Sequence, residues 1–164
     1  SVESKLGMGT TFTFVIDFES NMEKTNEIIN NIQVDLTSSE AYKVLVVEDN
    51  HINQLITRKT IEKNNYLCKV VDDGFQALAI LEKEEFDIIL MDINMPLMNG
   101  FDTSRRIRQK GIDIPIIALT AFDKNEITDE AILAGMNDII VKPFESVQLF
   151  KIINCHILKT KSVV

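Results

Sequence analysis

The sequence lacks features that membrane and nucleic-acid-binding proteins need. No stretch approaches the roughly 18 uninterrupted apolar residues of a membrane span, and no signal peptide is apparent. Lys and Arg number 17 against 25 Asp and Glu, a net charge of −8, which is unfavourable for binding a phosphate backbone. We therefore expect no membrane contact by this chain and no direct contact with nucleic acid.

Cysteine and histidine are scarce, with two residues of each type. Cys68 lies in a strand-like apolar run and Cys155 in a late helical run, and the two have no CxxC or metal-type spacing. We expect two buried, reduced thiols in a cytoplasmic protein. We expect His51 and His156 on the surface.

From Tyr42 onward, strand-like runs alternate with helical patterns. The 164 residues, 45% of them hydrophobic, suit one globular domain with an appendage. This alternation predicts an α/β fold, a doubly wound five-stranded parallel sheet with strand order 2-1-3-4-5 and right-handed crossovers. Lys69 in the middle of the second strand indicates an edge position. The predicted strands are 44–47, 67–71, 88–91, 114–119 and 139–141, and the predicted helices are 51–64, 74–84, 101–109, 124–134 and 145–158.

The first 41 residues follow another pattern. A glycine-rich turn at 7–9 separates residues 1–5 from an alternating segment, 10–18, which predicts a hairpin. An isolated hairpin is marginally stable in water, and the chain starts with Ser1, so we expect a fragment of a longer protein. We expect residues 1–19 to be a domain remnant, 20–41 a linker, 42–158 the main domain and 159–164 a tail.

Polar residues end the central strands of the predicted sheet. The continuous apolar run 88–91, typical of a strand buried on both faces, stops at Asp92. Open α/β sheets place ligands at this carboxyl edge. The other strands end at Glu48 and Asp49, at Thr120 and Ala121, and at Lys142 and Pro143.

Crowded carboxylates are unfavourable unless a cation joins them. Mg²⁺ prefers oxygen ligands, so a Mg²⁺ site on Asp49 and Asp92 is the natural interpretation. With the metal and Lys142 offsetting charge, one carboxylate can attack phosphorus, while Lys142 and the Thr120 hydroxyl hold the phosphoryl oxygens. The alternative role for Asp49 is to cap the helix that begins near Asn50.

Residues 42 to about 158 resemble the receiver domain of two-component response regulators. Four segments carry the resemblance in order: VLVVEDN at 44–50, ILMDINMPLMNG at 89–100, PIIALTA at 115–121 and GMNDIIVKPF at 135–144. The resemblance implies that Asp92 is the phosphoacceptor, and that Glu48, Asp49, Asp92 and the backbone carbonyl of Asn94 bind Mg²⁺.

The same resemblance implies a phosphoryl-binding set. Thr120 and the backbone of Ala121 would bond phosphoryl oxygens, and Lys142 would pair with the phosphoryl group across a cis peptide to Pro143. Many receivers pair the threonine with an aromatic switch residue on the fifth strand, where this chain has Ile139. We therefore expect an intact phosphorylation site, but an altered transmission of the phosphorylated state through the last helices.

Two further segments point to a parent protein. EDN at 48–50 followed by NQ at 53–54 is similar to receivers of hybrid histidine kinases. The segment GMGTTFTF at 7–14 resembles the final hairpin of the histidine kinase ATP-binding domain. The resemblance implies a hybrid sensor kinase whose cytoplasmic receiver self-phosphorylates and self-dephosphorylates. The donor would be a phosphohistidine of the parent kinase or of a histidine phosphotransfer domain, and the last helices would allow a homodimer.

Two other functions stay open at this point. A haloacid-dehalogenase-type phosphatase also uses Asp, Thr, Lys and Mg²⁺, but needs a second Asp where this chain has Asn94. A receiver-like interaction module that never carries phosphate would have no need for the full acidic set.

Overall fold

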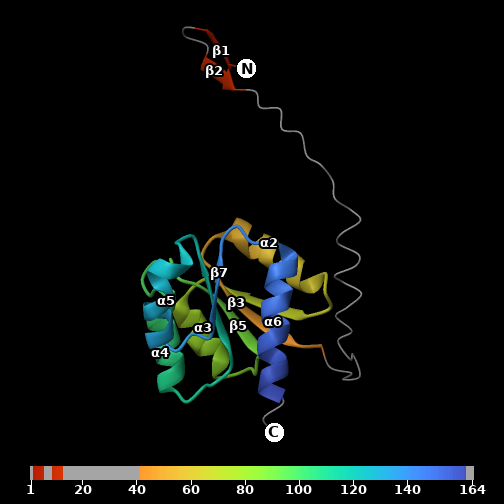
Figure 1. The fold of residues 1–164 in the computed structure, drawn as a ribbon, viewed down its shortest axis with the longest axis vertical. Coiled ribbons are helices and arrows are strands. Elements are labelled where there is room, and N and C mark those ends of the chain that lie inside the picture. Colours follow the sequence, from red (N-terminus) through yellow and green to blue (C-terminus); the bar gives the residue numbers. More distant parts are fainter. Residues whose placement is uncertain (1, 6–8, 13–40, 162–164) are drawn as a thin grey trace. The chain divides into compact units, whose positions relative to one another are not determined.

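The structure is a computed structural model that describes residues 2–5, 9–12 and 41–161 (Figure 1). The chain divides into two compact units, residues 1–39 and 40–164. In the first unit, strand β1 (Val2–Lys5) pairs antiparallel with β2 (Gly9–Phe12). The predicted strand beyond Phe12 and the predicted linker up to residue 40 lie outside the described residues.

The second unit contains a five-stranded parallel sheet with the strand order β4-β3-β5-β6-β7. This order is the predicted 2-1-3-4-5 arrangement, and the predicted α/β fold is confirmed. The elements in chain order are β3 (Lys43–Val47), α2 (His51–Glu62), β4 (Leu67–Val71), α3 (Gly74–Leu81), β5 (Ile88–Asp92), α4 (Gly100–Gln109), β6 (Ile116–Thr120), α5 (Lys124–Leu133), β7 (Asp138–Val141) and α6 (Ser146–Lys161).

Helices cover both faces of this sheet, with α2 and α6 on one face and α3, α4 and α5 on the other (Figure 1). Every residue of β5 and β6 is buried, which explains why these strands are continuous apolar runs without alternation. Successive side chains of β5 join opposite clusters: Ile89 belongs to the same cluster as Ala77 of α3, and Leu90 belongs to the same cluster as Ile153 of α6. The predicted edge position of β4 is confirmed, and Lys69 is exposed.

The ends of several elements differ from the prediction. Strand β6 begins at Ile116 instead of Ile114, because Pro115 has no amide hydrogen to enter the ladder. Helix α2 ends at Glu62, and the chain turns where Asn65 adopts a left-handed φ of 62°. Helix α6 continues past residue 158 to Lys161. None of the described helices has the length and apolarity needed to cross a bilayer.

Three side chains near α6 and β4 correct or refine the expectations. Cys155 is exposed, not buried, because Leu149, Ile153 and Ile157 occupy the inward positions of α6 at four-residue spacing. Cys68 is partly buried, and this burial raises the pKa of its thiol to about 11. The prediction for His156 is also wrong: it is partly buried, with Nε2 3.3 Å from Asp138 Oδ2.

We expect the two thiols to react at different rates in the folded protein. Cys155 is exposed, whereas Cys68 is shielded and its raised pKa leaves little thiolate at pH 8. Iodoacetamide should therefore modify Cys155 about tenfold or more faster than Cys68. Peptide mass spectrometry at successive times measures the two rates. The denatured chain is the control and should lose this preference. Equal rates in the folded protein would contradict the described burial.

Candidate functional site

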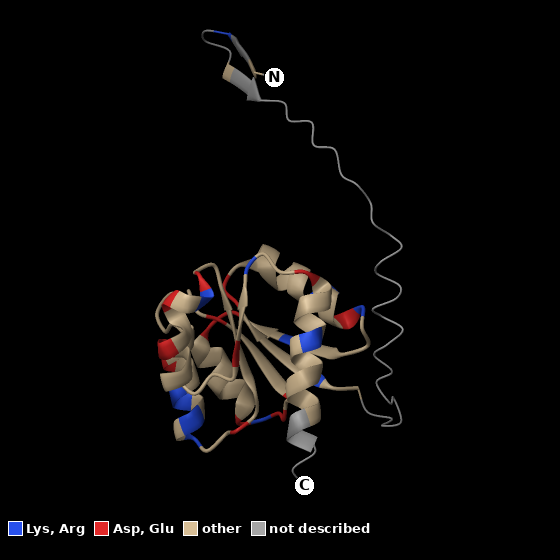
Figure 2. Ribbon diagram, viewed as in Figure 1, with Lys and Arg blue, Asp and Glu red and all other residues tan. Residues whose placement is uncertain are grey.

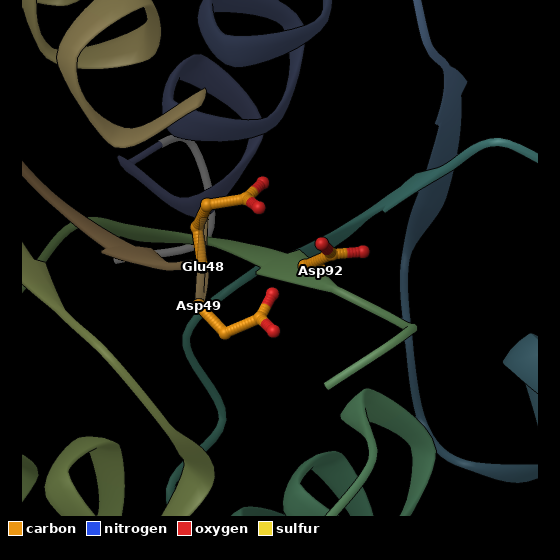
Figure 3. Close-up of side chains that lie close together, drawn as sticks. All are labelled: Glu48, Asp49 and Asp92. Carbon is orange, nitrogen blue, oxygen red and sulfur yellow. The ribbon is translucent and has the colours of Figure 1, made fainter. Parts of the chain in front are cut away.

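The site lies at the carboxyl edge of the sheet, where two neighbouring strands end in acidic residues. Val47 of β3 pairs with Met91 of β5, so Glu48 and Asp92, the next residues along each strand, emerge side by side. Figure 3 shows the carboxylates of Glu48, Asp49 and Asp92 directed into one space. Each offers an oxygen, and these oxygens lie within 4.8 Å of one another. The predicted convergence of the three carboxylates is therefore seen in the structure.

The helix after the acidic pair is capped by Asn50. Its side-chain oxygen accepts hydrogen bonds from the backbone of Ile52 at 2.9 Å and of Asn53 at 3.2 Å. Asn50 therefore satisfies amides that would otherwise be unpaired in the first turn of α2. The alternative role of Asp49 as the helix cap is wrong, and its carboxylate belongs to the acidic cluster.

This cluster has the properties of a divalent-cation site. Glu48 and Asp92 are 1% and 6% exposed, whereas Asp49 is exposed to solvent. Hard oxygen donors on a partly open rim suit a hydrated Mg²⁺, which keeps several of its water ligands. Figure 2 shows acidic positions, in red, among the strand ends and loops at this edge. Basic residues are found in the last turn of α4, which carries Arg106 and Arg108. The donor set therefore fits the predicted metal.

Lys142 compensates the two buried carboxylates. Its Nζ donates to Glu48 Oε2 at 2.6 Å and to Asp92 Oδ2 at 2.9 Å. Burial raises the pKa of Asp92, and the hydrogen bond and charge of Lys142 offset only part of this effect. Burial alone would lower the pKa of Lys142, but its hydrogen bonds to Glu48 and Asp92 outweigh burial and raise it. Lys142 is therefore a stable ammonium shared by two acids.

Thr120 lies at the end of β6, next to this lysine. The Lys142 amide donates to the Thr120 carbonyl at 2.6 Å, which joins the ends of β6 and β7, and the Lys142–Pro143 peptide is cis. The buried Thr120 hydroxyl accepts from the Phe122 amide at 3.0 Å. Ala121, between them, is exposed. The hydroxyl is thus bonded to its own loop, one strand away from Asp92.

The loop after Asp92 folds back against the strand end. The Asn94 amide donates to Asp92 Oδ1 at 3.1 Å, so the predicted metal-ligand residue is held close to the acidic cluster. A side chain at Gly100 is excluded, because its Cβ would lie 2.3 Å from the Asp92 carbonyl oxygen. Glycine at this position permits α4 to start directly behind the acid.

Ile139, the predicted switch position, is buried in β7. It lines a cavity of about 170 Å³ together with Ala131 and Ile132 of α5 and with Met136, which lies between α5 and β7. An isoleucine at this position presents neither an aromatic ring nor a hydroxyl to solvent. The structure therefore has a buried aliphatic side chain at the position where many receivers have an aromatic switch residue.

The sequence reasoning assigned no role to Asn53 and Gln54, although it noted their motif. The Asn53 side chain donates to Glu48 Oε1 at 3.0 Å. Gln54 donates to the Glu48 carbonyl at 2.6 Å and to Asp72 Oδ1 at 2.7 Å. The available signal was their place in the first turn of α2, directly after the acidic pair.

Comparison with known proteins gives one consistent result for this part of the chain. Residues 44–154 match the family described as the response regulator receiver domain. The autoinducer 2 sensor kinase/phosphatase LuxQ of Vibrio vulnificus is 36% identical over 150 residues, which cover 91% of this chain and 18% of that protein. The sensor protein EvgS of Escherichia coli is 30% identical over 143 residues, covering 87% and 12%. The chain thus spans less than a fifth of these relatives.

Two solved structures illustrate the similarity in fold. The chemotaxis protein CheY4 of Vibrio cholerae superimposes with a TM-score of 0.69 at 31% identity, covering 71% of this chain and 99% of that one. The receiver domain of sensor histidine kinase PA1611 from Pseudomonas aeruginosa has a TM-score of 0.67 at 36% identity, covering 72% and 98%. That structure has a magnesium ion coordinated in its active-site cleft.

We expect Lys142→Met to destabilise the fold by about 3 kcal/mol or more, because it leaves Glu48 and Asp92 buried without their shared cation. Urea unfolding without divalent cations measures this change in the free energy of unfolding. Lys124→Met is the matched control: Lys124 lies 3.4 Å from Asp138 in an exposed pair, worth less than about 1 kcal/mol. Equal losses for the two variants would contradict the role of Lys142.

Proposed function

Because this chain belongs to the response regulator receiver domain family of two-component systems, we propose that Asp92 is the phosphoacceptor of a phosphorelay. The observation that carries the proposal is the environment of this carboxylate. Asp92 is buried at the end of a central strand, 2.9 Å from Lys142 Nζ and beside Glu48 and Asp49. Few structural roles need three acids and one ammonium at the same sheet edge.

We infer that Glu48, Asp49, Asp92 and the backbone carbonyl of Asn94 hold Mg²⁺ in the working protein. Support comes from the clustered oxygens of the three acids and from the magnesium in the cleft of the related PA1611 receiver. The metal, when bound, would supply positive charge next to the transferred phosphoryl oxygens. The remaining chemistry rests on side chains and amides of this chain.

In the proposed reaction an Asp92 carboxylate oxygen attacks the phosphorus of a phosphohistidine. An oxygen–phosphorus bond forms, the phosphorus–nitrogen bond breaks, and the leaving imidazole keeps the electron pair and takes a proton from water. Lys142 would then turn from Asp92 Oδ2 to the new phosphoryl group. The Thr120 hydroxyl already accepts from the Phe122 amide, so its own hydrogen can donate to a phosphoryl oxygen. The Ala121 amide would bond the same group.

The output step would differ from that of receivers with an aromatic switch. Movement of Thr120 toward the phosphoryl group would still remodel the loop after β6. The residue at this position is the buried, aliphatic Ile139. There is therefore no aromatic ring here that could exchange between buried and exposed positions. We propose that signalling runs through the loop at 121–123 and the start of α5.

We propose that the parent protein is a hybrid sensor histidine kinase and that this chain belongs to its cytoplasmic portion, whether or not the parent is anchored in a membrane. The relatives LuxQ and EvgS are named as sensor kinase and sensor protein, and the chain covers only 18% and 12% of them. In this proposal residues 1–19 end the ATP-binding domain, 20–41 form the linker, 42–158 form the receiver and 159–164 form a tail. This piece alone would not bind ATP, and it would catalyse only its own phosphorylation and dephosphorylation.

The face of α2 next to the site is suited to dock the phosphohistidine donor. A cavity of about 360 Å³ is lined by Lys142, by Phe144 and by residues of α2. On the same helix, the side chain of Ile52 is 69% exposed. Ile56 lines the same cavity and is itself exposed. An apolar surface that reaches the reactive lysine would place a helical donor's histidine over Asp92.

Membership of the receiver family favours this function over a haloacid-dehalogenase-type phosphatase. That chemistry needs an acid two residues after the nucleophile, where this chain has Asn94. An interaction module that never carries phosphate stays a rival, and phosphorylation chemistry separates the two.

We expect acetyl phosphate with Mg²⁺ to add one phosphoryl group to the wild-type chain, detected by intact-mass spectrometry. Hydroxylamine should remove the adduct, because an acyl phosphate is labile to this nucleophile. Asp92→Asn should stay unmodified. Asp102→Asn is the control, because this exposed acid of α4 pairs with Arg105 away from the site and should leave the adduct unchanged. No adduct on the wild-type chain would favour the interaction module.

We expect Ile56→Glu to slow phosphoryl transfer from a phosphorylated histidine phosphotransfer domain by about tenfold, because it places a charge in the apolar docking face. Labelling by acetyl phosphate should be unchanged, since this small donor needs no docking surface. Leu133→Glu, on an exposed position of α5, is the control and should alter neither rate. A slower reaction with both donors would contradict a docking role.

A further inference from the structure

We propose that Asn53 is a positioning residue that holds the Glu48 carboxylate in the orientation required for binding a divalent cation. This inference rests on the metal site of the proposed function and assigns a role to a residue outside the acidic set. Asn53 lies in the first turn of α2, and its side chain donates to Glu48 Oε1 at 3.0 Å.

Glu48 needs such a partner because it is 1% exposed. A buried carboxylate is costly unless its oxygens accept hydrogen bonds. Lys142 bonds Oε2 at 2.6 Å, while Oε1 accepts from Asn53 at 3.0 Å and from the Asn50 amide at a longer 3.3 Å. Asn53 therefore provides the shorter of the two bonds to Oε1.

Lys142 cannot provide this support throughout the proposed reaction. Its Nζ is divided between Glu48 and Asp92, and pairing with a phosphoryl group on Asp92 would draw it away from Glu48. Among the described residues, Asn53 would then be the one side chain that still bonds the Glu48 carboxylate and keeps it in place.

The neutral charge of Asn53 is essential to this role. A lysine or arginine at this position would compete with the cation, and a second acid would repel Glu48 in the metal-free protein. An amide donates a hydrogen bond and leaves the negative charge of Glu48 available to the metal. Outer groups that orient metal ligands in this way change affinity strongly even though they do not touch the metal.

The surrounding contacts fix the position of Asn53. The Asn50 cap accepts from the Asn53 amide at 3.2 Å, which sets the backbone at the start of α2. The next residue, Gln54, donates to the Glu48 carbonyl at 2.6 Å and reaches Asp72 at 2.7 Å. The first turn of α2 thus holds both the backbone and the carboxylate of Glu48.

Isothermal titration of the full chain with Mg²⁺ alone tests the proposal. We expect Asn53→Ala and the similarly sized Asn53→Leu to weaken Mg²⁺ affinity about tenfold. Asn64→Ala is the matched control, because the Asn64 side chain donates to the Thr60 carbonyl at the far end of α2, away from Glu48. The Mg²⁺ affinity of this variant should equal that of the wild type. Wild-type affinity in both Asn53 variants, or an equal loss in Asn64→Ala, would overturn the proposal.

A double-mutant cycle shows whether Asn53 acts through Glu48. In a Glu48→Gln background, Asn53→Ala should cause little further loss of Mg²⁺ affinity, because the carboxylate it positions is gone. The same tenfold loss in both backgrounds would overturn the positioning role. If the wild-type chain itself bound no Mg²⁺, the proposed metal site would fail, which is distinct from a wild-type chain that binds Mg²⁺ independently of Asn53.

Discussion

The ammonium of Lys142, shared between Glu48 and Asp92, is the interaction on which the site depends. It joins the ends of β3, β5 and β7, three strands that lie far apart in sequence. Two buried carboxylates would repel each other without it. The strand order makes the arrangement possible, because the acids follow adjacent strands and the lysine follows an edge strand close enough to reach both. The strand order of the sheet therefore determines which charged side chains form the ion-paired cluster.

The same cluster explains how stability and reactivity coexist in this receiver. The ammonium offsets buried charge in the metal-free protein, so the acids can be held ready at the sheet edge. Glu48 accepts hydrogen bonds from three uncharged residues, Asn50, Asn53 and Gln54. These bonds fix the loop and leave the negative charge of the Glu48 carboxylate unneutralised. Ile139 lies outside this cluster. An altered output switch is therefore compatible with intact phosphoacceptor chemistry.

Sequence reasoning predicted the sheet order and brought Glu48, Asp49, Asp92 and Lys142 to one edge, because strand ends of a parallel sheet must share that edge. It could not predict which side chains turn toward Glu48, since hydrogen-bond direction depends on rotamers and on the exact start of α2. The sequence pattern was also insufficient to predict which residues of α6 face the core and which face solvent. A shift of two positions along a helix moves a residue from the core to solvent, and this separates Cys155 from Ile153.

The role of Asp92 as phosphoacceptor can be tested by ¹⁹F NMR of beryllofluoride, a phosphoryl mimic, with the wild-type chain and with Asp92→Asn. If Asp92 is the phosphoacceptor, we expect protein-bound fluorine signals that require Mg²⁺ in the wild type and are absent from Asp92→Asn. Bound signals that persist in Asp92→Asn, or a wild-type chain that gives none with Mg²⁺, would contradict the assignment of Asp92 as the phosphoacceptor.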